Sequence, residues 1–199
     1  MADAVARGRS NQRSRTRKDL LAAANRLLET GRTPTLDEVA AEAMVSRATA
    51  YRYFSGIDDL LVEAGLDVAM PDETLFAGDD DGDTIERLLR ADAAVADMIR
   101  ANEPALRTML IHSLQRGLAG DDVLPNRQNR RTPLIEAALA PVRAEMAPAR
   151  HRQLVRALAL VIGTEARIAF KDVLQLEDSE ADSVRAWMIR SLVQAALQD

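Results

Sequence analysis

The ten residues VSRATAYRYF, Val45 to Phe54, place two arginines and two tyrosines behind a serine. Ser46 is a favourable N-cap residue and predicts a short helix that begins directly after it. In that helix Ala50, Tyr53 and Phe54 recur at i, i+3 and i+4, which puts them on one face, toward a core. The opposite face then carries four residues, with Thr49 at its edge: Arg47, Ala48, Tyr51 and Arg52.

A second short helix is predicted immediately before this one. Thr35 opens the sequence Thr-Leu-Asp-Glu, a capping box in which Glu38 reaches back over the helix start. Apolar residues follow at helical spacing up to Ala43, and a four-residue turn leads to Ser46. Upstream, the apolar spacing over residues 15–28 predicts a longer helix. Two short helices joined by a tight turn fit a helix-turn-helix, whose second helix enters the DNA major groove.

The outward side chains suit contact with DNA. The guanidinium groups of Arg47 and Arg52 can fork onto guanine, and the methyl group of Thr49 can meet a thymine methyl. The hydroxyl of Tyr51 can hold a phosphate oxygen. The alternative is a solvated face on an ordinary helix pair. The capping box, the turn, the outward side chains and the basic N-terminal segment together argue against that alternative.

Charge is distributed unevenly along the chain of 199 residues, whose net charge is −5. Residues 1–54 carry a balance of +4 and the remaining residues a balance of −9. Residues 1–14 are polar and basic without apolar periodicity, so we expect a flexible arm there. Such an arm can follow the DNA backbone or enter the minor groove, and the expected DNA contacts include Arg13, Arg15 and Arg17.

The rest of the chain also predicts helices and no strands, so the expected fold class is all-α. Pro141 is expected to kink or split one helix, and Ser179 to cap the last. The expected domains are the arm, a helix-turn-helix domain over 15–56 and a larger helical domain over 57–199. The expected helices beyond the third cover 57–69, 84–101, 104–119, 132–146, 149–175 and 179–198.

Composition excludes several classes of site. The chain has no cysteine, so disulfides, cysteine-bound zinc and cysteine nucleophiles are excluded. The chain has two histidines, so a histidine-rich metal site is not expected. It has no nucleotide-binding glycine loop, so no cofactor is expected either. No apolar run is long enough to span a bilayer, so we expect a cytoplasmic protein without a membrane partner. The alternatives are a helical enzyme with an incidental helix-turn-helix, and an architectural DNA binder with steep salt dependence.

Three motifs between about Arg15 and Leu61 resemble the DNA-binding domain of TetR-family transcriptional regulators. They are TLDEVA at 35–40, VSRAT at 45–49 and YRYF at 51–54. The resemblance implies a homodimer that places its third helix in each half of a palindromic operator. It further implies a larger domain that dimerises and binds a small molecule, most often in a repressor that the ligand releases from DNA.

The resemblance also assigns roles to individual residues. Arg47 and Thr49 match positions that contact bases or phosphates, and Arg52 matches a variable position that adjusts sequence preference. Phosphate contacts are implied for Thr35, Tyr51 and Tyr53. The sequence departs from the family pattern at three positions: Met44 replaces a turn glycine, Ile57 replaces a phosphate-contacting lysine, and Ala50 replaces a larger aliphatic residue.

The larger domain gives weaker signals. His112 can contact a ligand or be an ordinary surface histidine, and Glu165 can be a specificity group or half of a salt bridge. The expected pocket candidates are His112, Gln115, Arg116, Glu165 and Arg167. An apolar stripe on the last helix is core, pocket wall or dimer seam. Expected interface residues are Leu158, Ile162, Val184, Trp187, Met188, Ser191, Leu192 and Ala195.

Overall fold

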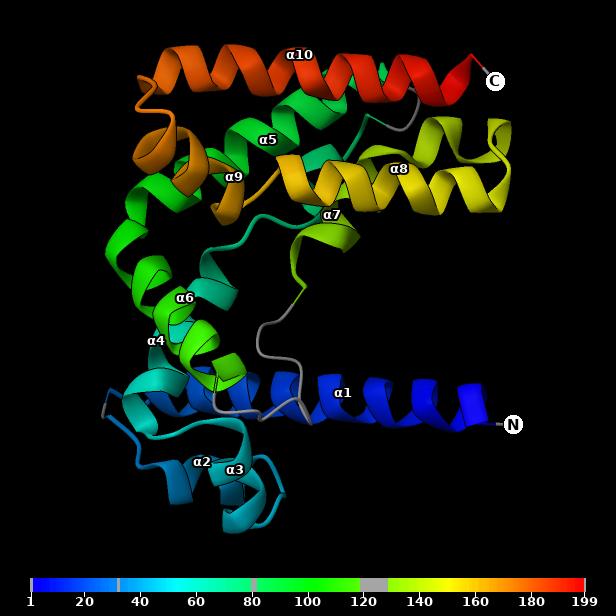
Figure 1. Cartoon of the computed structure of the whole chain (residues 1–199). Helices are drawn as coiled ribbons and strands as arrows, with labels where there is room; N and C mark the ends of the chain where they lie inside the picture. Colours follow the sequence, from blue (N-terminus) through cyan, green and yellow to red (C-terminus); the bar gives the residue numbers. More distant parts are fainter. Residues whose placement is uncertain (1, 32, 80–81, 119–128, 199) are drawn as a thin grey trace. The chain divides into compact units, whose positions relative to one another are not determined.

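The computed structural model of the chain describes residues 2–31, 33–79, 82–118 and 129–198, with the backbone alone for residues 2–11, 13 and 116. Every regular element in these residues is helical, which confirms the expected all-α class (Figure 1). No helix among them is long and apolar enough to cross a membrane. The chain divides into two compact units, one formed by Met1–Ala69 with Glu103–Gln128 and the other by Met70–Asn102 with Asn129–Asp199.

The first unit contains the predicted helix-turn-helix. Its helices are α1 (Ala2–Leu28), α2 (Leu36–Glu42), α3 (Arg47–Tyr53), α4 (Ile57–Ala69) and α6 (Glu103–Leu118). One apolar cluster joins α1 to α4, with Leu20, Val39, Ala50, Phe54 and Leu60 among its buried members. The first unit therefore has its own core, and that core fixes α2 and α3 against α1.

The N-terminal helix is longer than expected. The sequence predicts a start near Arg15 after a flexible arm, whereas α1 begins at Ala2. Residues 2–14 lack apolar spacing, but alanine and arginine are strong helix formers, which favours continuation of the helix toward the N-terminus. The grouping of helices also differs from the expected boundary at residue 57, because α4 and α6 belong to the same compact unit as α1–α3.

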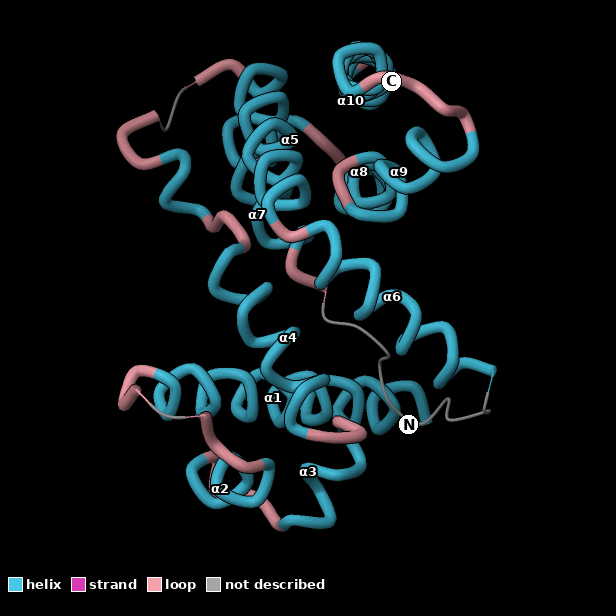
Figure 2. The backbone as a smooth tube through the Cα atoms, turned by 90° about the vertical axis from the view of Figure 1, so that its left-hand side faces the viewer, coloured by secondary structure: helices cyan, strands magenta, loops and turns pink. Residues whose placement is uncertain are grey.

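The second unit contains the remaining helices. They are η1, a 3₁₀ turn (Glu73–Phe76), α5 (Thr84–Ala101), α7 (Arg131–Ala138), η2, a 3₁₀ segment (Ala140–Glu145), α8 (Pro148–Val161), α9 (Thr164–Ile168), η3, a π turn (Ala169–Val173), and α10 (Asp178–Leu197). Helices α8 and α10 pack side by side and run antiparallel, and both are viewed nearly end-on in Figure 2. The expected interruption at Pro141 is confirmed, because α7 ends before it and η2 follows.

The helix expected over 149–175 is broken at Gly163. Ile162 leaves the helical region with ψ 87°, and α9 begins only at Thr164. A Cβ atom on Gly163 would collide with Nη1 of Arg131, which donates to the carbonyl of Ala159 at 2.8 Å. The guanidinium therefore occupies the space that a side chain would fill and satisfies a carbonyl at the end of α8.

The start of α10 also differs from the expected one. Glu177, not Ser179, is the N-cap residue, and its side chain makes no capping hydrogen bond. Two aspartates follow in the first turns, where arginines pair with them: Arg167 of α9 with Asp178, and Arg185 of α10 itself with Asp182. One ion pair between helices and one within α10 thus stabilise its start in place of a serine cap.

Candidate DNA-binding surface

Side-chain caps fix the starts of both short helices. The Thr35 amide donates to the Glu38 carboxylate at 2.7 Å, and the Glu38 amide donates to the Thr35 hydroxyl at 3.3 Å. The Ser46 hydroxyl accepts from the Thr49 amide at 3.1 Å and lies 2.8 Å from the Thr49 hydroxyl. The predicted capping box and the predicted serine cap are both confirmed.

The turn between α2 and α3 has a left-handed residue at Met44, with φ 55° and a side chain 92% exposed. The amide of Val45 donates to the carbonyl of Ala40 at 2.9 Å, and that of Met44 to the carbonyl of Ala41 at 3.0 Å. These bonds close the end of α2 in the way that a glycine usually permits. The turn therefore has a left-handed residue at the position where the family pattern has glycine, and the methionine side chain makes that conformation strained.

Replacing Met44 with glycine is expected to stabilise the first unit by about 1 kcal/mol, because glycine adopts the left-handed region without steric cost. The gain is reduced by the greater freedom of glycine in the unfolded chain. Urea denaturation followed by circular dichroism measures it. Alanine at the same position is the matched control and should leave stability nearly unchanged, because the exposed methionine side chain packs against little. Equal stability of the glycine and alanine variants would contradict this account.

Helix α3 separates a buried face from an exposed one. Ala50, Tyr53 and Phe54 are at most 3% exposed, as the spacing predicts. The opposite side presents Arg47, Ala48, Tyr51 and Arg52, all exposed, and Thr49 at the edge is half-buried. Thr35 and Ser46 are also exposed. Most of the residues that the sequence marked for DNA contact are thus exposed, and four of them lie on one face of α3.

Tyr53 does not belong to that surface. The phosphate contact that the resemblance implies for it disagrees with its position, because its side chain is 3% exposed. The ring packs in the core, and the guanidinium of Arg52 lies above it with 5.8 Å between Cζ and the ring centroid. The buried ring of Tyr53 therefore contacts the exposed guanidinium of Arg52 from the side of the core.

Arg17 is a second correction. It is one of the expected DNA contacts, but it is 2% exposed and lies inside the first unit. Its Nε donates to Glu63 at 2.9 Å, its Nη1 donates to the Tyr53 carbonyl at 3.3 Å, and its Cζ lies 4.5 Å from the centroid of the Phe54 ring. Arg17 precedes Leu20 and Leu21 by three and four residues, so it shares their inward face.

Two further arginines of α1, Arg13 and Arg15, are also expected DNA contacts. Arg15 is exposed on α1, and the side chain of Arg13 lies outside the described residues. Ile57, where the family pattern has a lysine, is half-buried and packs against the apolar cluster. Position 57 therefore contributes to the core, and the first turn of α4 carries the acidic residues Asp58 and Asp59 instead.

Two ion pairs connect exposed arginines of the first unit to α2. Asp37 in the first turn of α2 accepts from Nη2 of Arg47, and Glu42 at its end accepts from Nε of Arg26 at 2.8 Å. Only the first pair involves the reading helix α3. Asp37 is not among the residues that the sequence patterns indicate, although its neighbour Glu38 is the capping residue. The signal that could have found it is its position in the outward first turn of α2.

The ligand-pocket candidates mostly have protein partners. His112 on α6 pairs through Nδ1 with Asp59, whose other oxygen accepts from Ser55. Glu165 on α9 pairs with Arg131 at 2.8 Å, which agrees with the salt-bridge alternative. Arg167 pairs with Asp178 at 3.0 Å. Gln115 is exposed, and the side chain of Arg116 lies outside the described residues.

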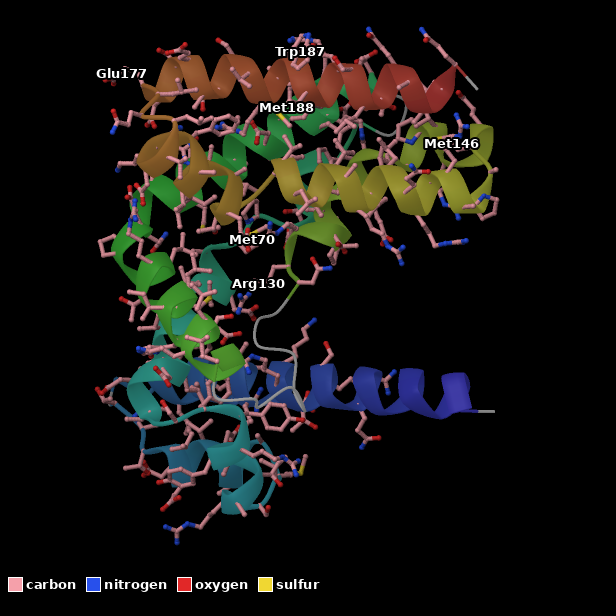
Figure 3. All side chains as sticks on the ribbon, in the orientation of Figure 1. Met70, Arg130, Met146, Glu177, Trp187 and Met188 are labelled. Carbon is pink, nitrogen blue, oxygen red and sulfur yellow. The ribbon has the colours of Figure 1, made fainter. Side chains whose placement is uncertain are left out.

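The interface candidates fall into two groups. Leu158 and Ile162 are completely buried in the second unit, so their side chains already belong to its core. Trp187 is 67% exposed and Ala195 is exposed, whereas the other candidates are half-buried: Val184, Met188, Ser191 and Leu192. In Figure 3 Met188 lies on the side of α10 toward α8, and Trp187 lies on the opposite side.

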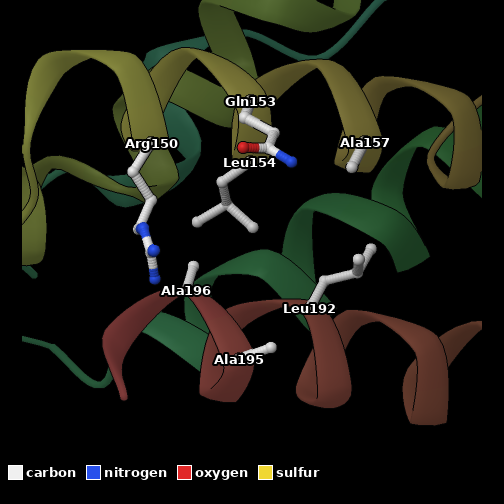
Figure 4. A pocket seen from close by; sticks show the side chains of 7 residues that line it. All are labelled: Arg150, Gln153, Leu154, Ala157, Leu192, Ala195 and Ala196. Atoms are coloured by element: carbon white, nitrogen blue, oxygen red, sulfur yellow. The ribbon is translucent and has the colours of Figure 1, made fainter. Parts of the chain in front are cut away.

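A shallow pocket of about 260 Å³ lies between α8 and α10 (Figure 4). Its floor is apolar, and the polar groups of Arg150 and Gln153 lie at its α8 side. The lining consists of Arg150, Gln153, Leu154 and Ala157 from α8 and of Leu192, Ala195 and Ala196 from α10. Two of the interface candidates, Leu192 and Ala195, therefore line a groove of the second unit.

Comparison with known proteins agrees with the geometry of the first unit. Residues 20–64 match the family model described as "Bacterial regulatory proteins, tetR family". No curated protein and no solved structure matches the chain. The matched residues run from the inner part of α1 through α2 and α3 into α4, and so include the capping box, the turn and the exposed face of α3. Residues 20–64 are therefore similar to the DNA-binding domain of the tetR family of bacterial regulatory proteins, and this similarity supports a DNA-binding transcriptional regulator.

Proposed function

We propose that the protein is a repressor that binds a palindromic operator as a homodimer and leaves it when a small molecule binds the second unit. The observation that carries the proposal is the exposed face of α3. This face presents Arg47, Tyr51 and Arg52 away from a core that fixes the helix from behind. A rigid helix with outward arginines is the arrangement that reads base edges in the major groove.

Each exposed group has a chemical role in this proposal. Arg47 and Arg52 offer forked donors to guanine or to phosphate, and the Tyr51 hydroxyl donates to a phosphate oxygen. Thr35 sits at the start of α2, where its exposed hydroxyl can reach the backbone of the same groove. Arg15 on α1 adds positive charge, so that the contacts on DNA are both sequence-reading and electrostatic.

The second unit supports the dimer and ligand parts of the proposal. Helix α10 exposes Trp187 and borders an apolar groove with α8, and a pair of such helices forms a four-helix seam with its copy. The ligand would act by stabilising one of two arrangements that differ in the spacing of the reading helices. We further expect the protein to work in the cytoplasm, where its operator lies.

Fluorescence anisotropy with the DNA upstream of the protein's own gene tests the proposal. Arg47→Ala is expected to lose about 1–3 kcal/mol of binding free energy on this duplex and much less on a scrambled one. The reason is that only the first duplex offers the base edge that the guanidinium reads. Arg26→Ala is the matched control, because Arg26 is an exposed arginine of the same unit that pairs with Glu42 away from α3.

The pattern of losses decides between specific and general binding. Equal losses on both duplexes, together with steep salt dependence, would favour the architectural DNA binder over the repressor. Absence of binding to any duplex at low salt would contradict the proposed function. Preference for the native duplex that persists at moderate salt supports it and gives the assay for a ligand screen.

A further inference from the structure

Asp37 places a carboxylate on the surface that carries the DNA-reading residues. A negative group beside DNA phosphates lowers affinity, so its presence there needs a physical reason. Capping does not supply one. The Thr35 hydroxyl and the Glu38 carboxylate already satisfy each other's amides at the start of α2. The cap of α2 therefore does not involve the carboxylate of Asp37.

The carboxylate of Asp37 is directed at the first residue of α3. Its Oδ2 accepts from Nη2 of Arg47, which bridges the two helices across the turn. Its Oδ1 is buried and has no hydrogen-bond partner among the described residues. The Asp37 side chain is 35% exposed, whereas that of Arg47 is 74% exposed. The carboxylate thus holds one edge of a guanidinium whose remaining donors stay accessible to solvent.

We propose that Asp37 is a positioning residue for DNA recognition, which orients Arg47 toward a base edge and prevents it from pairing with the nearest phosphate. The inference rests on the proposed function. A guanidinium has five N–H donors, so one engaged nitrogen still leaves donors for guanine O6 and N7. A free arginine beside DNA reaches phosphates of any sequence, whereas a held one contacts only the base opposite it.

Asp37 is therefore expected to lower the affinity for DNA in general and to raise the preference for the correct sequence. Asp37 cancels part of the positive charge of Arg47, which weakens binding to DNA of any sequence. It also fixes the geometry that a bidentate base contact requires, which favours the correct sequence. Removal of the carboxylate should therefore raise affinity for the wrong duplex and lower the ratio between the right and the wrong one.

The test uses the full chain and a duplex that the wild-type protein selects from a randomised library. Wild type, Asp37→Asn, Arg47→Ala and the double variant are titrated against this duplex and a scrambled one over a range of salt. Asp37→Asn is expected to reduce the ratio of the two affinities about tenfold. On the scrambled duplex its salt slope should steepen by about one, because Arg47 gains a phosphate contact.

Two comparisons show whether Asp37 acts through Arg47. In the Arg47→Ala background, Asp37→Asn should leave the ratio unchanged, whatever it does to overall affinity. Glu42→Gln removes the same charge from the other end of α2, where Glu42 pairs with Arg26, and should leave the ratio at its wild-type value. Melting curves by circular dichroism, run beside the titrations, separate a loss of folding from a loss of discrimination.

Three outcomes would overturn the inference. The first is an unchanged affinity ratio in a folded Asp37→Asn variant, and the second is an equal reduction in Glu42→Gln. The third is a reduction by Asp37→Asn that persists without Arg47. A wild-type protein that selects no sequence from the library would overturn the proposed function and this inference together. Selection by the wild type combined with any of the three outcomes would overturn this inference alone.

Discussion

Replacing Glu63 by alanine is expected to destabilise the first unit by about 3–5 kcal/mol, because it leaves the guanidinium of Arg17 buried without its carboxylate. Arg17 is 2% and Glu63 is 3% exposed, so water cannot take over the lost contact. The pair makes two N–H···O bonds, of which the Nε–Oε1 bond is 2.9 Å long. Urea denaturation monitored by circular dichroism measures the loss.

An exposed ion pair of the same unit provides the matched control. Arg26 and Glu42 are 54% and 39% exposed at a similar distance of 2.8 Å, so Glu42→Ala should cost less than about 1 kcal/mol. The double variant Arg17→Met with Glu63→Leu should recover most of the lost stability, because it removes both charges and keeps the volume. A cost below 1 kcal/mol for Glu63→Ala would contradict the buried position of the pair.

The same pair connects folding to DNA binding. Arg17 on α1 reaches Glu63 on α4 and also donates to the carbonyl of Tyr53, the last residue of α3. The reading helix is therefore held at its C-terminal end by Arg17 and at its N-terminal end by Asp37. Even where Glu63→Ala stays folded at low temperature, its affinity for the selected duplex should fall, since Arg17, which donates to the last residue of α3, loses the carboxylate that holds it.

Local chemistry made the DNA-binding surface predictable. Thr35 and Ser46 form their caps with residues three positions away, so a short stretch of sequence contains both partners. The inward position of Ala50 and Phe54 follows in the same way from helical spacing. The turn was predictable in the same way. The family pattern has glycine at position 44, and the backbone of Met44 is left-handed.

Contacts between distant residues were not predictable. Arg17 and Glu63 are separated by 46 positions, and the partner of Arg185 lies 93 positions away. A charged residue on an apolar face signals that a partner exists but does not identify it. At the break Gly163 lies against Arg131 of another helix, and the apolar spacing, which continues on both sides of the glycine, does not reveal that neighbour. These features follow from the packing of the whole unit.

Replacing Arg185 by methionine is expected to destabilise the second unit by about 3–5 kcal/mol near pH 7, because it isolates the carboxylate of Asp92. Arg185 is 1% exposed, and its Nε lies 3.0 Å and 3.1 Å from the two carboxylate oxygens of Asp92. Asp92 itself is 7% exposed. Methionine keeps the length and apolar character of the arginine stem, so the loss reports the missing charge more than a cavity.

The loss should depend on pH in a defined direction. Burial raises the pKa of Asp92 above its ordinary value, although the hydrogen bond and the charge of Arg185 act to lower it. Without Arg185 this pKa rises further, so the folded variant binds a proton at a higher pH than the unfolded chain does. The penalty is therefore full above the folded pKa and is relieved as the pH falls through it. Stability measured from about pH 8 to about pH 5 should converge toward that of the wild type.

The double variant Asp92→Leu with Arg185→Met distinguishes an isolated charge from damaged packing. It removes the carboxylate that causes the penalty, so its stability should exceed that of Arg185→Met at neutral pH and should not converge toward the wild type with acid. Asp182, which also accepts from Arg185 at 2.5 Å, is 45% exposed and can be solvated when the guanidinium is lost. If the single and double variants lose the same stability at every pH, the cost lies in packing and the assigned role of Asp92 is wrong.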